Sequence, residues 1–298
     1  MLERRVEVGR LRDLRALRPE AVADAAAARR RRPLLSPGGR LMLVAADHPA
    51  RNAFGVRGEP MAMGDREELL ERLAVALSRP GVDGVLGTAD VLEDLLLCGA
   101  LDGKVVIASM NRGGLAGAAF ELDDRFTAYD ADAVAAAGFD GGKMLTRIDL
   151  ADPSTADTLE ASGRAVTALA GHRLMAMVEP FLSSRVDGKV RNDLSTEAVV
   201  RSVGIASALG ATSAYTWLKL PVVDGMDTVM AATTLPTLLL GGDPDDSPEE
   251  TYGVWEKALA LPGVRGLVVG RTLLYPPDGD VAAAVDTAAR LVHGEGAA

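Results

Sequence analysis

A lysine inside an apolar segment is the strongest chemical signal in this sequence. Lys219 lies near the end of residues 214–221, an apolar run with the pattern of a buried strand. Lysine is also scarce here, because only five of the 32 basic residues are lysines. Lysine is rarely buried without a partner or a chemical role, and a desolvated lysine can lose its proton where arginine cannot. We therefore predict that Lys219 is an amine nucleophile that forms a Schiff base with a carbonyl substrate.

Three further ionisable residues, Asp47, Lys143 and Glu179, lie at or just after the ends of other apolar runs. Each has a structural interpretation of its own, since Asp47 could bind loop amides and Lys143 could neutralise a buried carboxylate. Burying all of these charges together is costly unless a function retains them. We therefore predict that the three residues form one catalytic group with Lys219.

Two glycine-containing segments near the C-terminal end have the composition of an anion site. Gly241 and Gly242 end one apolar run, and Gly270 and Arg271 follow the next. Glycine lets backbone N–H groups approach a phosphate without interference from a Cβ atom, and arginine adds charge-assisted donors. We expect these residues to bind a phosphate.

Other polar residues are candidates for binding the rest of a substrate. Asn111 and Arg112 follow a third run, and Arg147 follows a fourth. Arg51, Arg112 and Arg147 are all candidates for a substrate carboxylate, and the sequence does not rank them. We interpret His48 as a loop histidine with satisfied hydrogen bonds rather than a metal ligand, because no second histidine lies at ligand spacing.

Alternating strand-like and helix-like segments must position these residues. The predicted strands cover residues 40–46, 84–87, 104–110, 142–146, 173–178, 213–220, 236–240 and 266–269. The predicted helices cover residues 65–78, 89–97, 130–137, 154–170, 195–209, 226–234, 248–261 and 281–292. Strands that are apolar throughout are covered on both faces, so eight β/α units predict a (β/α)8 TIM barrel. A doubly wound open sheet is the main alternative, but G-x-G-x-x-G does not follow the first strand.

We expect one barrel domain over residues 40–298, preceded by a helical extension over residues 1–39 that contains a helix at residues 10–32. In a TIM barrel the chemistry occupies the C-terminal ends of the strands, where the candidate residues above would meet. The extension could cap the bottom of the barrel or contact another subunit. We interpret its basic run, Arg29–Arg32, as solvated charge at the end of the helix.

The composition excludes several classes of protein. A net charge of −10 and a pI of about 4.9 argue against a nucleic-acid surface. A single cysteine, Cys98, rules out an intrachain disulfide framework and fits a reducing compartment. No apolar run reaches the roughly 18 residues that span a membrane, and the first residues lack a signal-peptide core. We expect a cytoplasmic enzyme, a homo-oligomer, that acts on a small molecule.

These features resemble the class I aldolase superfamily of TIM barrels, which contains deoxyribose-phosphate, fructose-bisphosphate and tagatose-bisphosphate aldolases. In that superfamily the Schiff-base lysine lies on the sixth strand, which is the position of Lys219. In its ketose-bisphosphate members an Asp on strand one, a Lys on strand four and a Glu on strand five surround that lysine. The resemblance carries these roles to Asp47, Lys143 and Glu179. It carries the phosphate site of strands seven and eight to Gly241, Gly242, Gly270 and Arg271.

Two longer segments resemble a narrower group. Residues 45–52 (AADHPARN) and residues 215–221 (YTWLKLP) are similar to an actinobacterial barrel family found with inositol-catabolism enzymes. That resemblance implies cleavage of 6-phospho-5-dehydro-2-deoxy-gluconate to dihydroxyacetone phosphate and malonate semialdehyde. It also implies that neither a cofactor nor a metal is needed, since the iminium replaces the Lewis acid of metal-dependent aldolases.

The expected mechanism gives each charged residue a role. Lys219 attacks the ketone carbon, and the cation of Lys143 favours the free amine. Glu179 shuttles protons during carbinolamine formation and dehydration, and at the hydroxyl whose deprotonation breaks the carbon–carbon bond. Asp47 orients the substrate hydroxyl or Lys143. Two alternatives stay open: a metal-dependent barrel lyase with Asp47, His48 and Glu179 as ligands, and a barrel that binds a phosphosugar without cleaving it.

Overall fold

The two-residue alternation of a β-strand determines what the centre of the molecule contains. In β1 (Leu41–Ala45), Leu41, Leu43 and Ala45 belong to an inner apolar cluster, whereas Met42 and Val44 belong to the outer cluster under the helices. All five side chains are buried, as expected of a strand covered on both faces.

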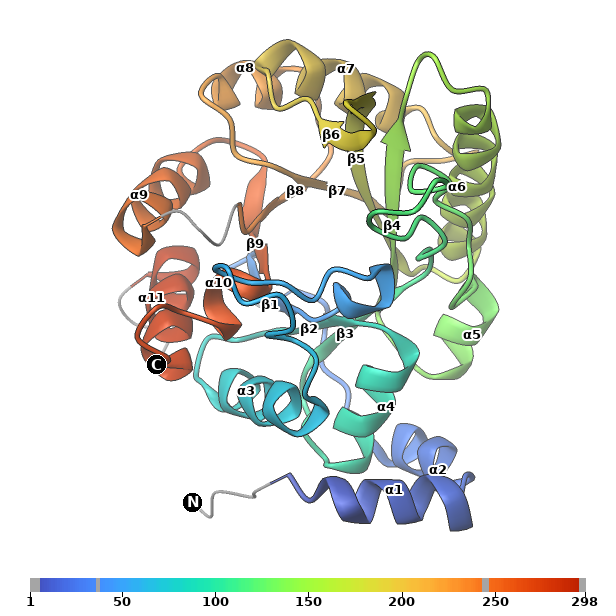
Figure 1. The fold of residues 1–298 in the computed structure, drawn as a ribbon, viewed down its shortest axis with the longest axis vertical. Helices are drawn as coiled ribbons and strands as arrows, with labels where there is room; N and C mark the ends of the chain where they lie inside the picture. Colours follow the sequence, from blue (N-terminus) through green and yellow to red (C-terminus); the bar gives the residue numbers. More distant parts are fainter. Residues whose placement is uncertain (1–5, 36–37, 243–246, 295–298) are drawn as a thin grey trace.

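The computed structural model describes residues 6–35, 38–242 and 247–294; the predicted domain ends 1–5 and 295–298 lie outside them. The strands form a closed ring of parallel pairings, in which β4 pairs β5 and β9 returns to β1 (Figure 1). The ring strands are β1, β2 (Gly84–Gly87), β3 (Val105–Ser109), β4 (Gly141–Ile148), β5 (Met175–Val186), β7 (Thr216–Leu220), β8 (Thr237–Leu240) and β9 (Val264–Val269). This closure confirms the predicted TIM barrel and excludes the open sheet.

Helices surround the ring (Figure 1). They are α3 (Arg66–Ser78), α4 (Ala89–Leu97), α5 (Ala131–Ala136), α6 (Ser154–Gly171), α7 (Thr196–Ser207), α8 (Met226–Ala231), α9 (Pro248–Leu259), the short α10 (Arg271–Leu274) and α11 (Val281–His293). Several begin at side-chain caps; for example, the carboxylate of Asp65 accepts a hydrogen bond from Glu68 N at 3.0 Å. No helix in the described part of the chain is long and apolar enough to cross a membrane.

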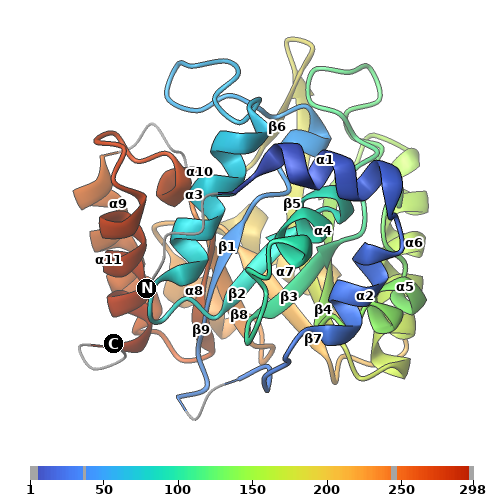
Figure 2. The ribbon, with the colours of Figure 1, turned by 90° about the horizontal axis from the view of Figure 1, so that it is seen from below.

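The N-terminal extension differs from the predicted single helix. It forms α1 (Val8–Leu17) and α2 (Ala21–Ala28), because Pro19 disfavours the helical conformation of the residue before it. Figure 2 shows both helices against the outside of the barrel, and α2 contacts α4.

The chain then passes under the base of the barrel, where the expectation of solvated arginines was wrong for Arg29. Arg29 is buried, and its guanidinium donates to the backbone oxygens of Lys104 at 2.7 Å and Gly138 at 2.6 Å. Leu34 packs against the inner apolar cluster of the barrel. Arg29 and Leu34 thus pack against the base, whereas Arg30 and Arg31 remain exposed to water as expected.

One strand extends beyond the ring. β5 continues past the barrel rim and pairs antiparallel with β6 (Lys189–Asn192). The turn residues Asp187 and Gly188 have φ angles of 51° and 76°, the positive values that a tight hairpin needs and that an Asp-Gly pair adopts readily. The sequence prediction ended this strand at Val178 and missed the hairpin, although the Asp-Gly pair was the signal for it.

Candidate active site

The side-chain alternation of the strands carries the four predicted ionisable residues to the upper end of the barrel interior. Lys219 lies two residues after Trp217, which belongs to the inner apolar cluster. Glu179 likewise follows Met177 by two residues, and Asp47 follows Ala45 by two. Each therefore points into the mouth of the barrel from the C-terminal part of its strand or just beyond it.

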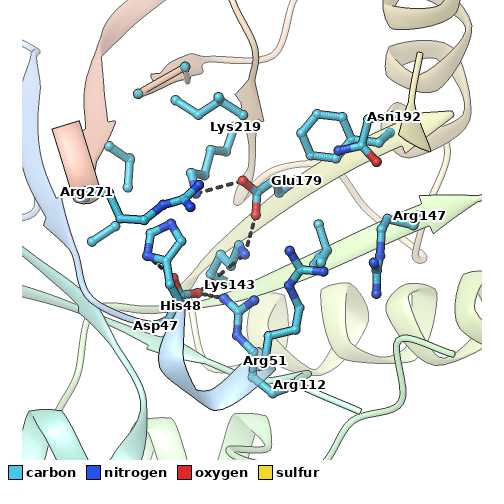
Figure 3. Close-up of a pocket in the computed structure, with 18 of the residues that line it drawn as sticks. Asp47, His48, Arg51, Arg112, Lys143, Arg147, Glu179, Asn192, Lys219 and Arg271 are labelled. Atoms are coloured by element: carbon cyan, nitrogen blue, oxygen red, sulfur yellow. Dashed lines mark hydrogen bonds and ion pairs between the residues drawn. The ribbon is translucent and has the colours of Figure 1, made fainter. Parts of the chain in front are cut away.

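These side chains form a continuous chain of charged contacts (Figure 3). Lys219 Nζ lies 2.7 Å from Glu179 Oε1, and Glu179 Oε2 contacts Lys143 Nζ. Lys143 Nζ lies 3.5 Å from Asp47 Oδ2, which also contacts the guanidinium of Arg112. The residues Lys143, Lys219, Glu179 and Asp47 are only 1%, 4%, 7% and 2% exposed, so these charges interact with little screening by water.

Burial shifts the pKa of both lysines in the direction that favours a nucleophile. Burial lowers the pKa of Lys219, and Glu179 opposes this while Arg112 and Arg51 reinforce it. Burial also lowers the pKa of Lys143, with Arg112 again reinforcing the effect. Burial alone would raise the pKa of Glu179, but the two lysines lower it, so Glu179 is a carboxylate.

The charges do not balance when every group is ionised. Lys143, Lys219 and Arg112 contribute three cations against the two carboxylates of Asp47 and Glu179. Since arginine keeps its proton, loss of one proton from a lysine neutralises the cluster. The arrangement thus favours one free amine in the mouth of the barrel.

The cluster lies in a cavity of about 460 Å³, a size that suits a small-molecule ligand. At one side lie Gly241, Gly242, Gly270 and Arg271, the residues predicted to bind phosphate. Gly242 has a φ of 73°, and a Cβ atom on Gly270 would lie 2.5 Å from the backbone oxygen of Ala45. Glycine is therefore favoured at position 242 and required at position 270. A Cβ atom at Gly242 would have no described atom within 4 Å, so the backbone there is open to an approaching anion.

The other side of the cavity is also basic. Arg51, Arg147, and Arg191 and Asn192 of the hairpin line it, and Figure 3 shows Arg147 and Asn192 on the side opposite Arg271. The guanidinium of Arg147 is occupied, since Nη2 lies 2.5 Å from Asp124 Oδ1. In contrast, the Arg51 guanidinium makes no hydrogen bond or ion pair with any residue that the structure describes.

Asn111 is not among the residues that line this cavity, although its neighbour Arg112 is. Its Oδ1 accepts a hydrogen bond from Leu145 N at 2.7 Å, and its Nδ2 donates to the backbone oxygens of Leu145 and Asp124. Asn111 thus joins β4 to the loop that follows β3. Because all of its amide groups are occupied, the expectation that Asn111 binds substrate gives way to a structural role.

Comparison with known proteins defines the family. A family model described as Cgl0159-like matches residues 39–289. The chain belongs to the Cgl0159-like family. A crystal structure of Cgl0159 from Corynebacterium glutamicum is 59% identical, with a TM-score of 0.94 and 96% of each chain covered. No curated protein matches the chain.

More distant solved structures share the fold of this Cgl0159-like protein. An archaeal fructose-1,6-bisphosphate aldolase, with its catalytic lysine bound to a carbinolamine intermediate, has a TM-score of 0.67 at 18% identity; the match covers 92% of this chain and 100% of that chain. A fructose-bisphosphate aldolase from Slackia heliotrinireducens has a TM-score of 0.60 at 17% identity. That match covers 95% of this chain and 91% of the Slackia chain. The Cgl0159-like chain therefore has the same barrel fold as these two aldolases.

Two parts of the Cgl0159-like cavity were missed from the sequence. His48 lines the cavity although it was interpreted as a satisfied loop histidine, and the hairpin contributes Arg191 and Asn192. Within the described ranges, no three His, Cys, Asp or Glu side chains are grouped as a metal site. The carboxylates of Asp47 and Glu179 instead contact cationic side chains.

Proposed function

We propose that this protein is a class I aldolase that cleaves a phosphorylated keto sugar or keto sugar acid through a Schiff base on Lys219. The observation that carries the proposal is the 2.7 Å contact between Lys219 Nζ and Glu179 Oε1 inside the barrel mouth. A buried amine beside a carboxylate can transfer a proton to it while attacking a carbonyl carbon.

Schiff-base formation uses both groups. The free amine of Lys219 attacks the ketone carbon, and the proton lost from Nζ passes to Glu179. Glu179 then gives this proton to the oxygen, which completes the neutral carbinolamine. A second proton, taken up from the solvent by Glu179, passes to the carbinolamine hydroxyl, which leaves as water and produces the iminium. Lys143 keeps the carboxylate oriented through its contact with Oε2.

The iminium then acts as the electron acceptor for cleavage. Loss of the proton from the hydroxyl two carbons away releases the aldehyde, and the electrons of the broken carbon–carbon bond form an enamine. Protonation of the enamine carbon and hydrolysis release the ketose phosphate and return Lys219 to its starting state.

The two basic sides of the cavity support a substrate with an anion at each end. Gly241, Gly242, Gly270 and Arg271 would hold a phosphate, so that the carbonyl stands beside Lys219. Arg51 is the best placed of the three candidate arginines for a carboxylate, because Arg112 and Arg147 already contact Asp47 and Asp124. We propose 6-phospho-5-dehydro-2-deoxy-gluconate, an intermediate of inositol catabolism, as the substrate.

A coupled assay for release of dihydroxyacetone phosphate from a panel of ketose phosphates tests the proposal. We expect cleavage by the wild type and a loss of at least about 1,000-fold in Lys219→Met, since no other group replaces the covalent bond. Lys257→Met, which changes an exposed lysine on α9, is the matched control. Full activity of Lys219→Met, or loss of wild-type activity with EDTA, would refute the proposal.

A further inference from the structure

His48 lies beside the reacting centre at the end of β1, next in sequence to Asp47. Its backbone is fixed, because its carbonyl oxygen accepts hydrogen bonds from Arg51 N at 3.0 Å and Ala53 N at 3.3 Å. Its ring packs against Gly270, where a Cβ atom would lie 2.7 Å from Cε1. In Figure 3 the ring lies on the same side of the cavity as Arg271. His48 therefore faces the cavity from a rigid position.

The imidazole of His48 makes no hydrogen bond to the described residues around it. Its Nδ1 is buried and has no hydrogen-bond partner among the residues that the structure describes. The nearest carboxylate atom, Asp47 Oδ1, lies 3.9 Å away, beyond hydrogen-bonding distance. A buried, unpaired ring nitrogen is unusual, and a ligand in the cavity would provide its missing partner.

The other acid–base groups of the cavity are already engaged. Glu179 contacts both lysines, Asp47 contacts Arg112 and Lys143, and Glu121 Oε2 accepts a hydrogen bond from Gly117 N at 2.9 Å. The cleavage proposed above nevertheless requires two proton transfers. One takes a proton from the substrate hydroxyl, and the other gives a proton to the enamine carbon. His48 is the acid–base side chain that remains for both transfers among the described cavity residues.

We infer that His48 moves this proton during carbon–carbon bond cleavage, an inference that rests on the proposed aldolase function. The neutral imidazole takes the proton of the hydroxyl two carbons from the iminium as the bond breaks and the aldehyde forms. The resulting imidazolium gives the same proton to the enamine carbon, which restores the iminium. The role predicted for Glu179 at this hydroxyl passes to His48, and Glu179 keeps the steps at the carbinolamine.

The charges around His48 suit this role. Burial lowers the pKa of His48 well below its ordinary value, and Arg271, Lys219 and Lys143 act in the same direction against Glu179. His48 is therefore neutral before cleavage, ready to accept a proton. Once formed, the imidazolium is a strong donor and returns the proton readily.

The half-reaction with dihydroxyacetone phosphate isolates this transfer. In D2O, we would follow the exchange of one hydroxymethyl hydrogen by NMR, and separately trap the Schiff base with borohydride. We expect His48→Gln and His48→Asn to form the adduct, which also shows that they fold. Their hydrogen exchange should fall about 100- to 10,000-fold. His172→Gln changes an exposed histidine paired with Asp132 and should match the wild type.

Exchange at the wild-type rate in both His48 variants would overturn the inference and leave the proposed function intact. Loss of the adduct in these variants would also overturn it, because His48 would then act in binding or Schiff-base formation. Failure of the wild type to form any adduct would instead refute the proposed function, and with it this inference.

Discussion

Glu179 holds Lys219 by one carboxylate oxygen, with Nζ and Oε1 2.7 Å apart, while its other oxygen contacts Lys143. One buried carboxylate thus serves two buried amines. Asp47 stabilises Lys143 from its other side, at 3.5 Å, and also contacts Arg112. The cluster carries one more cation than anion when all groups are ionised, and a lysine proton is the one that it can readily lose.

Lys143→Met should convert this cluster to a balanced one and so raise the pKa of Lys219. With two cations facing two carboxylates, Lys219 is expected to remain an ammonium ion. We predict that kcat at neutral pH falls about 100- to 10,000-fold and that the pH–rate profile moves to higher pH. The fold should persist, because each carboxylate keeps one cationic partner. Unchanged kinetics would reduce Lys143 to a structural ion pair.

Gly270→Ala should disturb the predicted phosphate site directly. The new Cβ atom would lie 2.5 Å from the backbone oxygen of Ala45 and 2.7 Å from His48 Cε1. We predict a loss of about 1–3 kcal/mol in unfolding free energy, as for overpacking, with a KM for phosphorylated substrate at least about tenfold higher. Gly253→Ala is the control, because a Cβ atom there would have no neighbour within 4 Å and alanine favours the helix. Equal KM values for the two variants would contradict this prediction.

Arg51→Gln should reveal whether the second anion of the substrate is a carboxylate. In the synthetic direction, dihydroxyacetone phosphate can be offered either malonate semialdehyde or an uncharged aldehyde as acceptor. We predict that KM for malonate semialdehyde rises about 10- to 100-fold, the value of one charged hydrogen bond, while KM for the uncharged acceptor stays constant. An equal change for both acceptors would remove Arg51 from carboxylate recognition.

Asp83 gives the base of the barrel a pH-dependent stability. Burial would raise the pKa of Asp83, but hydrogen bonds from His293, the Met42 N–H and Arg32 lower it below the ordinary 3.8. Because the pKa of Asp83 is lower in the folded state, its carboxylate stabilises the fold at every pH above the ordinary pKa of an aspartate. This stabilisation is lost as the pH falls through the folded-state pKa.

Asp83→Asn should therefore reduce the unfolding free energy by about 1–3 kcal/mol near neutral pH, with the difference shrinking in acid. Urea unfolding of the wild type and the variant between about pH 3 and pH 7 measures this difference in unfolding free energy. That range includes the pH at which an ordinary Asp titrates. A difference independent of pH would show that the carboxylate charge is not responsible.

The sequence was sufficient for the barrel because its strands are apolar on both faces and its helices begin at clear capping residues. The sequence was also sufficient to predict that Asp47 and Lys219 lie in one site, although they are far apart in the chain. Closure of the barrel places the C-terminal ends of its strands at one rim. Strand alternation then directs both side chains inward.

The other parts of the candidate site depend on three-dimensional contacts that the sequence pattern does not show. Asn111 follows a strand just as a substrate-binding residue would, but its amide turns to the backbone of β4. Among the described residues, His48 Nδ1 has no hydrogen-bond partner, since Asp47 Oδ1 lies 3.9 Å away and Asp47 Oδ2 contacts Arg112. Arg191 reaches the cavity because β5 continues into a hairpin, which an Asp-Gly pair signalled but periodicity did not.

Reductive trapping tests the central claim most directly. The wild type, incubated with dihydroxyacetone phosphate and borohydride and then digested, is predicted to carry the reduced adduct on the peptide that contains Lys219. The peptide with Lys143 should be unmodified, and Lys219→Met should yield no adduct. An adduct on Lys143 in place of Lys219, or cleavage of substrate by a wild type that never forms an adduct, would contradict the account.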